Sequence, residues 1–252
     1  SLRSVHPVHW YRSKLLLLYL PLLINGDHLL LHIIKRTLPF QFDQKTDFTF
    51  EGEGWNPIGS AEHPFLQPFD GQGHRITGLW NICDAAAGTS STNSPAADGA
   101  GLFAAVGSSI SNLVIDGAFL SVSDTGLSAG NYDSIGVLAA QSPKNDSETV
   151  FTYAPSHSIT SCSVLNAHFA CKNVPNSGML TGVTYCQTIF LSVYASGSAY
   201  IDSTPETTAS SFPRVSFGMI TGYLPKSNFY YHFKNCSSQG TVTDAHSTAQ
   251  IG

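Results

Sequence analysis

The sequence Gly101-Leu102-Phe103-Ala104-Ala105 sets a pattern that the chain repeats: a glycine, two bulky apolar residues, and two small or hydroxylated residues. Later copies begin at Gly136, Gly178 and Gly218, so that successive glycines lie 35, 42 and 40 residues apart. Ile251-Gly252 follows at the distance where a fifth copy would begin. Internal similarity at such a period is typical of solenoid proteins. The repeat therefore predicts one elongated domain of stacked coils, with the four glycines at its corners.

Short apolar segments, rich in β-branched and aromatic residues, separate the copies of this pattern; Ile110–Ile115 and Ile159–Leu165 are examples. Beyond the first 39 residues, no stretch keeps helical spacing over three turns. We therefore expect an all-β fold, a right-handed parallel β-helix (a β-solenoid) with an N-terminal cap segment and excursion loops. The expected loops are polar and lie at residues 84–99, 123–134, 141–157 and 196–213.

Residues 1–39 differ from the remainder because they hold an apolar run, Leu15–Ile24, that follows Arg12 and Lys14. The run is too short to cross a membrane as a helix, and no small-residue cleavage site follows it. We expect residues 1–39 to be either a cap on the solenoid or an anchor, and the cap is favoured because repeat arrays need covered ends. Residues 40–252 form the predicted solenoid, which can continue beyond the given sequence.

Charge and composition narrow the classes of partner. The chain has a net charge of −5 and only 12% charged residues, about half the usual share. Residues 1–45 carry +4 and residues 46–252 carry −9, so the repeat region would repel a nucleic acid. We expect no nucleic-acid partner, and membrane contact only through residues 1–39. The five cysteines lack metal-ligand spacing, so no metal or other cofactor is expected.

Two pairs of residues are candidates for covalent modification. Cys162 and Cys236 occupy equivalent repeat positions, so they are either joined in a disulfide between neighbouring coils or buried as small apolar residues; the second is favoured. Asn145 and Asn235 each begin an Asn-x-Ser tripeptide, which is a glycosylation acceptor if the protein enters a eukaryotic secretory pathway.

Enzymatic activity is the minority hypothesis. Polysaccharide lyases and hydrolases built on β-helices need carboxylates facing one another, and only Asp116 with Asp84 or Asp98 offers such a set. The acids otherwise lie at turns, Asp70-Gly71 being a tight-turn dipeptide. The compact cluster of Asp70, His74 and Arg75 is interpreted as stabilising that turn. Nucleophile-elbow and phosphate-binding motifs are absent, so no catalytic residues are predicted.

The chain resembles the GLUG-motif (Gly-Leu-x-Gly) repeat proteins. The resemblance covers about residues 40–252 and is strongest in the blocks Trp55–Gly59 and Phe69–Leu79, which precede Gly101-Leu-Phe and Ile110–Ile115. The resemblance implies a right-handed parallel β-helix that belongs to a large secreted or cell-surface protein. Such proteins include adhesin-like proteins and proteins related to IgA-cleaving peptidases, in which the repeats are accessory and not catalytic. The family has no catalytic residues to carry over. This chain departs from the motif because its fourth position holds alanine or threonine.

These observations give three hypotheses of function. The leading one is a non-enzymatic extracellular or cell-surface β-solenoid, which serves adhesion or is a structural subunit of a filament or larger assembly. Its partners would be other protomers, surface proteins or glycans. The alternatives are a carbohydrate-active β-helix enzyme and a non-catalytic glycan-binding module. The module would use exposed tyrosines from the following set: Tyr185, Tyr194, Tyr200, Tyr223, Tyr230 and Tyr231.

Overall fold

The computed structural model describes residues 55–61, 63–84, 99–123, 134–143, 157–202, 215–225, 230–245 and 250–251. Within these residues the regular structure consists of strands and isolated bridges, with no helix. Every pairing between strands is parallel. The predicted all-β class is confirmed, and its sheets are parallel. Residues 1–39, the predicted cap or anchor, lie outside the described residues.

The strands follow one another in successive passes of the chain. The first pass holds β1 (Phe69–Thr77) and β2 (Trp80–Asp84), and the second holds β3 (Phe103–Ala105), β4 (Ile110–Asp116) and β5 (Phe119–Ser123). The third pass holds β6 (Ser134–Gly136), β7 (Ala139–Gln141), β8 (His157–Thr160) and β9 (Ser163–Lys172). The fourth holds β10 (Asn176–Gly178), β11 (Thr181–Val183), β12 (Thr188–Leu191) and β13 (Tyr194–Asp202). The fifth holds β14 (Ser216–Gly218), β15 (Thr221–Tyr223), β16 (Tyr231–Lys234) and β17 (Ser237–Asp244), and β18 (Gln250–Ile251) follows it.

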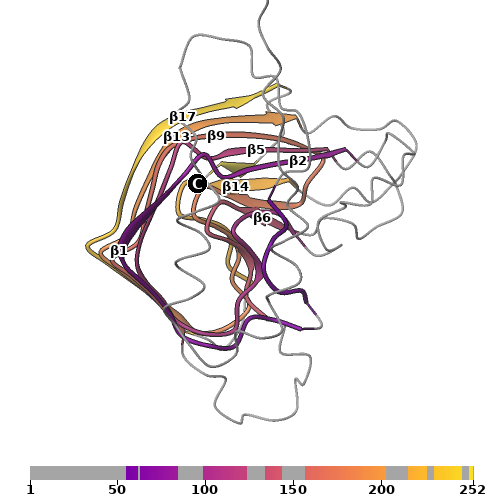
Figure 1. Ribbon diagram of the computed structural model, residues 1–252. Coiled ribbons are helices and arrows are strands. Elements are labelled where there is room, and N and C mark those ends of the chain that lie inside the picture. Colours follow the sequence, from indigo (N-terminus) through magenta and orange to yellow (C-terminus); the bar gives the residue numbers. More distant parts are fainter. Residues whose placement is uncertain are drawn as a thin grey trace, which may run out of the picture.

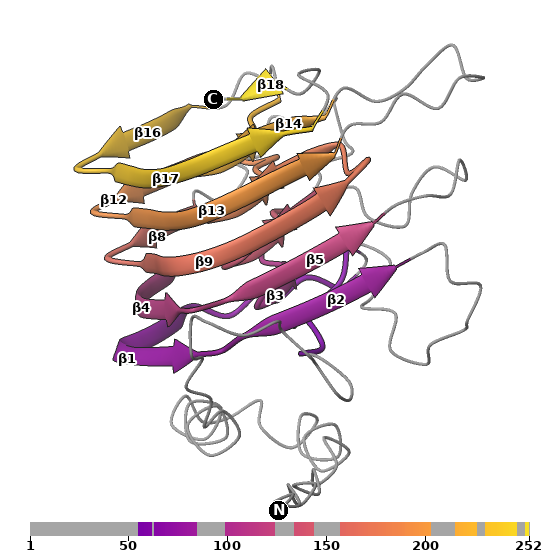
Figure 2. The ribbon, with the colours of Figure 1, turned by 90° about the horizontal axis from the view of Figure 1, so that it is seen from above.

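Strands from successive passes lie side by side in three sheets. The largest sheet has ten strands, in the order β16-β12-β8-β4-β9-β13-β17, with β1, β2 and β5 attached to this path. The other two run β18-β14-β10-β6 and β15-β11-β7-β3. Figure 1 looks along the stack, so that the strands outline a closed shape around the core, and Figure 2 shows the passes one above another.

Residues at equivalent positions form columns that run through the passes. One column joins an aromatic or aliphatic residue from each of the five passes: Phe69, Ile110, Ile159, Phe190 and Phe233. The first four are buried, and their neighbours along each strand alternate between buried and more exposed positions. Ile76 and Leu79, which lie at the end of β1 and just after it, are also buried. The core is therefore a stack of apolar columns between the sheets.

The glycines of the repeated pattern lie at bends between two sheets. Gly136, Gly178 and Gly218 are in register, and each is the last residue of its strand. The two apolar residues that follow form the bend, and Met179 and Leu180 are fully buried there. A Cβ atom on Gly178 would collide with the Thr181 carbonyl oxygen and the Gly222 nitrogen. Close approach of the backbone therefore requires glycine at this bend. Gly101 precedes the equivalent bend in the second pass.

Two of the expectations on loops and turns are wrong. The loop expected at residues 196–213 begins too early, because β13 continues to Asp202 and pairs with β9 and β17. Asp70-Gly71 does not reverse the chain but lies within β1, where the register with β4 shifts between Asp70 and His74. Most residues of the other expected loops lie outside the described residues.

A column of left-handed residues marks the outer bend of the largest sheet. Asn112, Ser161, Ser192 and Asn235 have φ angles of 53°, 53°, 54° and 54°. The strand register aligns the last three with one another, since Thr160 pairs with Leu191 and Leu191 with Lys234. Main-chain hydrogen bonds run between passes here, from Ser161 to Leu191 and from Ser192 to Lys234. Asparagine tolerates the left-handed conformation better than most residues, so its presence can suggest such a bend. Serine has no such preference, so Ser161 and Ser192 did not indicate the bend in the sequence.

Candidate interaction surface

The fifth pass exposes large aromatic side chains. Tyr230 is 71% exposed, Phe233 45% and Tyr223 43%, whereas the inward residues of the third and fourth passes are buried. All residues of β16 except Tyr231 are exposed, and so are most residues of β17. Figure 2 shows β16 and β17 at the end of the stack, beside β18. We call the exposed edge formed by β15, β16 and β17 the fifth-pass edge.

Phe233 shows how the apolar column ends at this edge. Its ring stacks on Phe190 with a centroid separation of 4.7 Å and an interplanar angle of 2°. One face of the Phe233 ring is therefore covered by the fourth pass, while the side chain remains half exposed. An apolar side chain of another strand in the same register would cover the second face as Phe233 covers Phe190.

No described strand pairs with the outer side of the fifth-pass edge. Among the described residues, β15 pairs with β11 alone, β16 with β12 alone and β17 with β13 alone. β18 covers only β14, in the neighbouring sheet. Main-chain N–H and C=O groups on such an edge are a template for another strand. The edge therefore combines exposed aromatic surface with a strand edge that no described strand covers.

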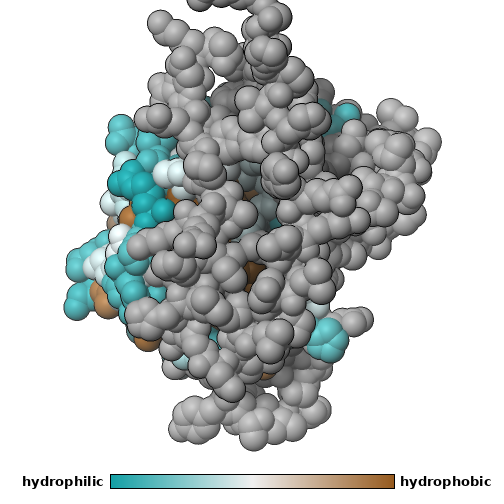
Figure 3. Space-filling model, in the orientation of Figure 1, coloured by the Kyte–Doolittle hydropathy of each residue, from teal (hydrophilic) through white to brown (hydrophobic). Residues whose placement is uncertain are grey.

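Elsewhere the visible described surface is mainly polar. In Figure 3, the described residues on the left of the view, near the bend labelled β1 in Figure 1, are mostly hydrophilic, with separate hydrophobic residues among them. Leu66 is 61% exposed in the first pass. Isolated apolar residues of this kind are normal on protein surfaces, so they do not by themselves indicate a binding site.

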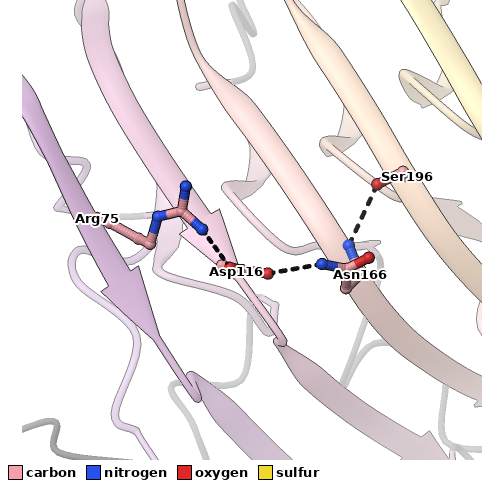
Figure 4. Close-up of polar contacts among 4 residues, drawn as sticks. All are labelled: Arg75, Asp116, Asn166 and Ser196. Carbon is pink, nitrogen blue, oxygen red and sulfur yellow. Dashed lines mark hydrogen bonds and ion pairs between the residues drawn. The ribbon is translucent and has the colours of Figure 1, made fainter. Parts of the chain in front are cut away.

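A row of polar side chains crosses four passes on the largest sheet (Figure 4). Arg75 on β1 forms an ion pair with Asp116 on β4, and the amide of Asn166 on β9 donates to the second Asp116 oxygen at 3.0 Å. The Asn166 main-chain nitrogen in turn donates to the Ser196 hydroxyl at 3.2 Å. Both oxygens of Asp116 therefore have partners within the protein. The sequence offered Asp84 and Asp98 as possible catalytic partners of Asp116. Asp98 and the side chain of Asp84 lie outside the described residues.

The cluster of Asp70, His74 and Arg75 does not form as expected. Asp70 accepts hydrogen bonds at 2.9 Å from the Gln72 main chain and from the Asn112 side chain. These bonds, with that to Asn112 the larger cause, lower the pKa of the Asp70 carboxyl because they favour its charged form. Arg75 pairs with Asp116 on the next pass instead. Asp70 therefore stabilises its own bend and links it to β4, without a shared site.

The alternative in which Cys162 and Cys236 form a disulfide is wrong. Both thiols are free, and Val193 of the fourth pass lies between them in register. Two strand spacings separate the cysteines by about 9–10 Å, and a disulfide needs Cα atoms closer than about 7 Å. Burial raises the pKa of the Cys162 thiol to about 11, and the thiol donates to main-chain oxygens. It therefore behaves as a small core residue.

The remaining candidate residues are dispersed. Asn235 is exposed at the outer bend of the fifth pass, and Asn145 lies outside the described residues. The six tyrosines do not share one exposed face: Tyr200 lies on β13 and is 49% exposed, while Tyr223 and Tyr230 belong to the fifth pass. Tyr231 donates its hydroxyl to the Thr184 carbonyl oxygen at 3.0 Å. This set is therefore not one sugar-stacking platform.

The described residues offer little for a metal or a large ligand. No group of three or more His, Cys, Asp or Glu side chains within them has a metal-binding arrangement. A small cavity of about 20 Å³ lies between passes and is lined by residues of several strands, including His157, Gln141 and Thr188. It has room for about one water molecule. In the part of the chain that the structure describes, no helix is long and apolar enough to cross a membrane.

No family model, curated protein or solved structure matches the chain.

Proposed function

We propose that the chain is a right-handed parallel β-helix of the GLUG-like kind, and that it serves as a non-enzymatic structural subunit of an assembly outside the cell or on its surface. Its partner is another protomer or a surface protein that adds to the fifth-pass edge. The extracellular location is supported by the family resemblance in residues 55–79. Adhesion through the same edge belongs to this proposal.

The right-handed winding is supported by the direction of the strands. In Figure 1 the strands β5, β9, β13 and β17 run from left to right along the top of the outline. Figure 2 views the molecule from above, and later passes lie farther from the viewer of Figure 1. A chain that turns clockwise as it recedes is a right-handed coil. Crossover connections between parallel strands have this hand in nearly all proteins.

The observation that carries the proposed function is the exposure of the fifth-pass edge. Phe233 is half exposed although the residues in the same column of the second, third and fourth passes are buried. Fully burying such a side chain contributes about 1.5–3 kcal/mol, and a strand that pairs with the edge would add main-chain hydrogen bonds to β16 and β17. Addition of a strand is thus favoured by both apolar and main-chain contacts.

The polar row on the largest sheet does not favour the carbohydrate-active alternative. Asp116 is held by Arg75 on one side and by Asn166 on the other, so that it is committed to contacts within the protein. A glycosidase or lyase instead needs carboxylates that face a groove. The row is better explained as a set of links between passes.

Sedimentation and light scattering of the full chain test the proposed function. We expect the wild-type mass to rise with concentration, because the fifth-pass edge is available for pairing. Phe233→Lys should remain monomeric, since it places a charge in the apolar column. Leu66→Lys is the matched control, because it replaces an apolar residue of the first pass that is more exposed than Phe233, and it should assemble like the wild type.

Circular dichroism would verify that each variant is folded. A wild-type chain that stays monomeric up to millimolar concentration would contradict the proposal. So would a folded Phe233→Lys variant that assembles as well as the wild type.

A further inference from the structure

His157 lies in the interior between successive passes. It is the first residue of β8, is 6% exposed, and lines the small cavity of about 20 Å³. Its main-chain nitrogen donates to the Gln187 carbonyl oxygen of the fourth pass at 3.0 Å. Its ring has a hydrogen bond with the main chain of Ser108 in the second pass. One residue of the third pass thus connects to the passes on both of its sides.

The described residues that line the cavity around the His157 ring are uncharged. The second pass contributes Ser108 and Val106, and β7 contributes Ala139 and Gln141. The remaining lining residues are also neutral: Ser142, Ile159, Thr181, Val183, Thr184 and Thr188. Two titratable groups lie beside this lining. The Tyr231 hydroxyl donates to the Thr184 carbonyl oxygen at 3.0 Å, and the Cys186 thiol, whose pKa is raised by burial, lies 3.7 Å from the Thr188 hydroxyl. No described carboxylate lines the cavity to balance an imidazolium ion.

We propose that His157 makes the stack acid-sensitive: while its buried ring is neutral, β8 packs between the second and fourth passes, and protonation of the ring loosens β8 from its neighbours. The geometry requires this because a charged ring would stand in a small cavity whose polar groups are hydroxyls and an amide. Burying a charge without an opposite charge is costly, so the protonated state favours an open arrangement in which water reaches the ring.

The direction of the pH dependence follows from the burial of the ring. Burial lowers the pKa of His157 below its ordinary value of 6.5, and the hydrogen bond with Ser108 opposes this effect only in part. The opened state therefore binds more protons than the closed state at mildly acidic pH. The closed state is most stable above pH 6.5, and its stability falls as the pH drops from 6.5 to the lowered pKa, below which it changes no further.

The residue that pairs with His157 in the neighbouring pass indicates which substitution can test the proposal. Thr188 pairs with His157 in the fourth pass and is buried, so threonine is already tolerated at this column position. His157→Thr therefore removes the titratable ring and keeps a buried hydroxyl. His232→Gln is the matched control, because His232 lies on β16 of the same sheet and is exposed.

Hydrogen exchange measured by mass spectrometry between about pH 7.5 and pH 5 tests the proposal. In the wild type, protection factors of β8 and β12 should fall as the pH drops, with a steepest slope of about tenfold per pH unit, which is the limit for one proton. The His232→Gln control should show the same slope, and His157→Thr should show none. Equal slopes in wild type and His157→Thr would overturn the proposal.

A second measurement keeps the proposal testable if His157→Thr does not fold. The ring of His157 can be titrated directly by NMR in the wild-type chain labelled at histidine. The proposal requires a midpoint below 6.5 together with broadening or loss of the β8 amide signals over the same pH range. A midpoint at or above 6.5, or a titration that leaves β8 unchanged, would overturn it.

Discussion

Phe69 in the first pass and Phe233 in the fifth pass occupy the same column of the largest sheet, yet their burial differs greatly. Phe69 is 7% exposed, and Phe233 is 45% exposed. Phe69 packs against Phe65 of its own pass and Phe103 of the second, with ring centroids 6.5 Å and 5.6 Å away. Phe233 has a ring partner only in Phe190 of the fourth pass among the described aromatic contacts.

The difference teaches that position along the stack, rather than residue type, decides how much each column residue stabilises the fold. At the first pass, Trp55, Ile58 and Phe65 pack against the core beside Phe69. At the fifth pass, no described strand lies on the outer side of β16 to cover Phe233. The two ends are therefore not equivalent, and the fifth-pass edge is the one suited to a partner.

The sharpest test of this comparison uses two stacked rings. Phe190→Ala should reduce the free energy of unfolding by about 3–5 kcal/mol, because Phe190 is fully buried between Ile159 and Phe233. Phe233→Ala should cost about 1 kcal/mol in the monomer, since half of the side chain already contacts water. Urea denaturation of dilute protein measures both. Equal losses would contradict the distinction between the interior and the edge.

A smaller effect is expected at the bend between the two shorter sheets. Gly178→Ala should cost roughly 1–3 kcal/mol, because the added methyl group collides with main-chain atoms at Thr181 and Gly222. Gly73→Asn is the control: Gly73 has a φ of 73° that asparagine tolerates, and no atom lies within 4 Å of the position that a Cβ atom would take there. Thermal unfolding compares the two, and a Gly178→Ala variant as stable as the control would refute the packing argument.

The repeated glycines made the stacking predictable, because close backbone approach at every bend demands the same small residue. Gly136, Gly178 and Gly218, chosen from the sequence, are in register in the structure. The short apolar, β-branched segment Ile110–Ile115 likewise predicted the strand that the structure shows as β4. These features are local, so they can be recognised from the sequence.

The links between passes were less predictable because they join residues far apart in the chain. Arg75 and Asp116 are separated by 41 positions, and Asn166 and Asp116 by 50. Loops of variable length separate the passes, so sequence spacing gives no register for such pairs. The same reason explains the cysteines: Cys162 and Cys236 are equivalent, as expected, but an entire pass lies between them.

Hydrogen exchange of the full chain at low and at high concentration tests the central claim most directly. In dilute protein, β12 and β13 should exchange slowly and β16 and β17 quickly, because no described strand pairs with the outer side of β16 or β17. At high concentration, β16 and β17 should become protected while β12 and β13 remain unchanged. Rapid exchange of β16 and β17 at every concentration, or protection of these strands already in the dilute monomer, would contradict the account.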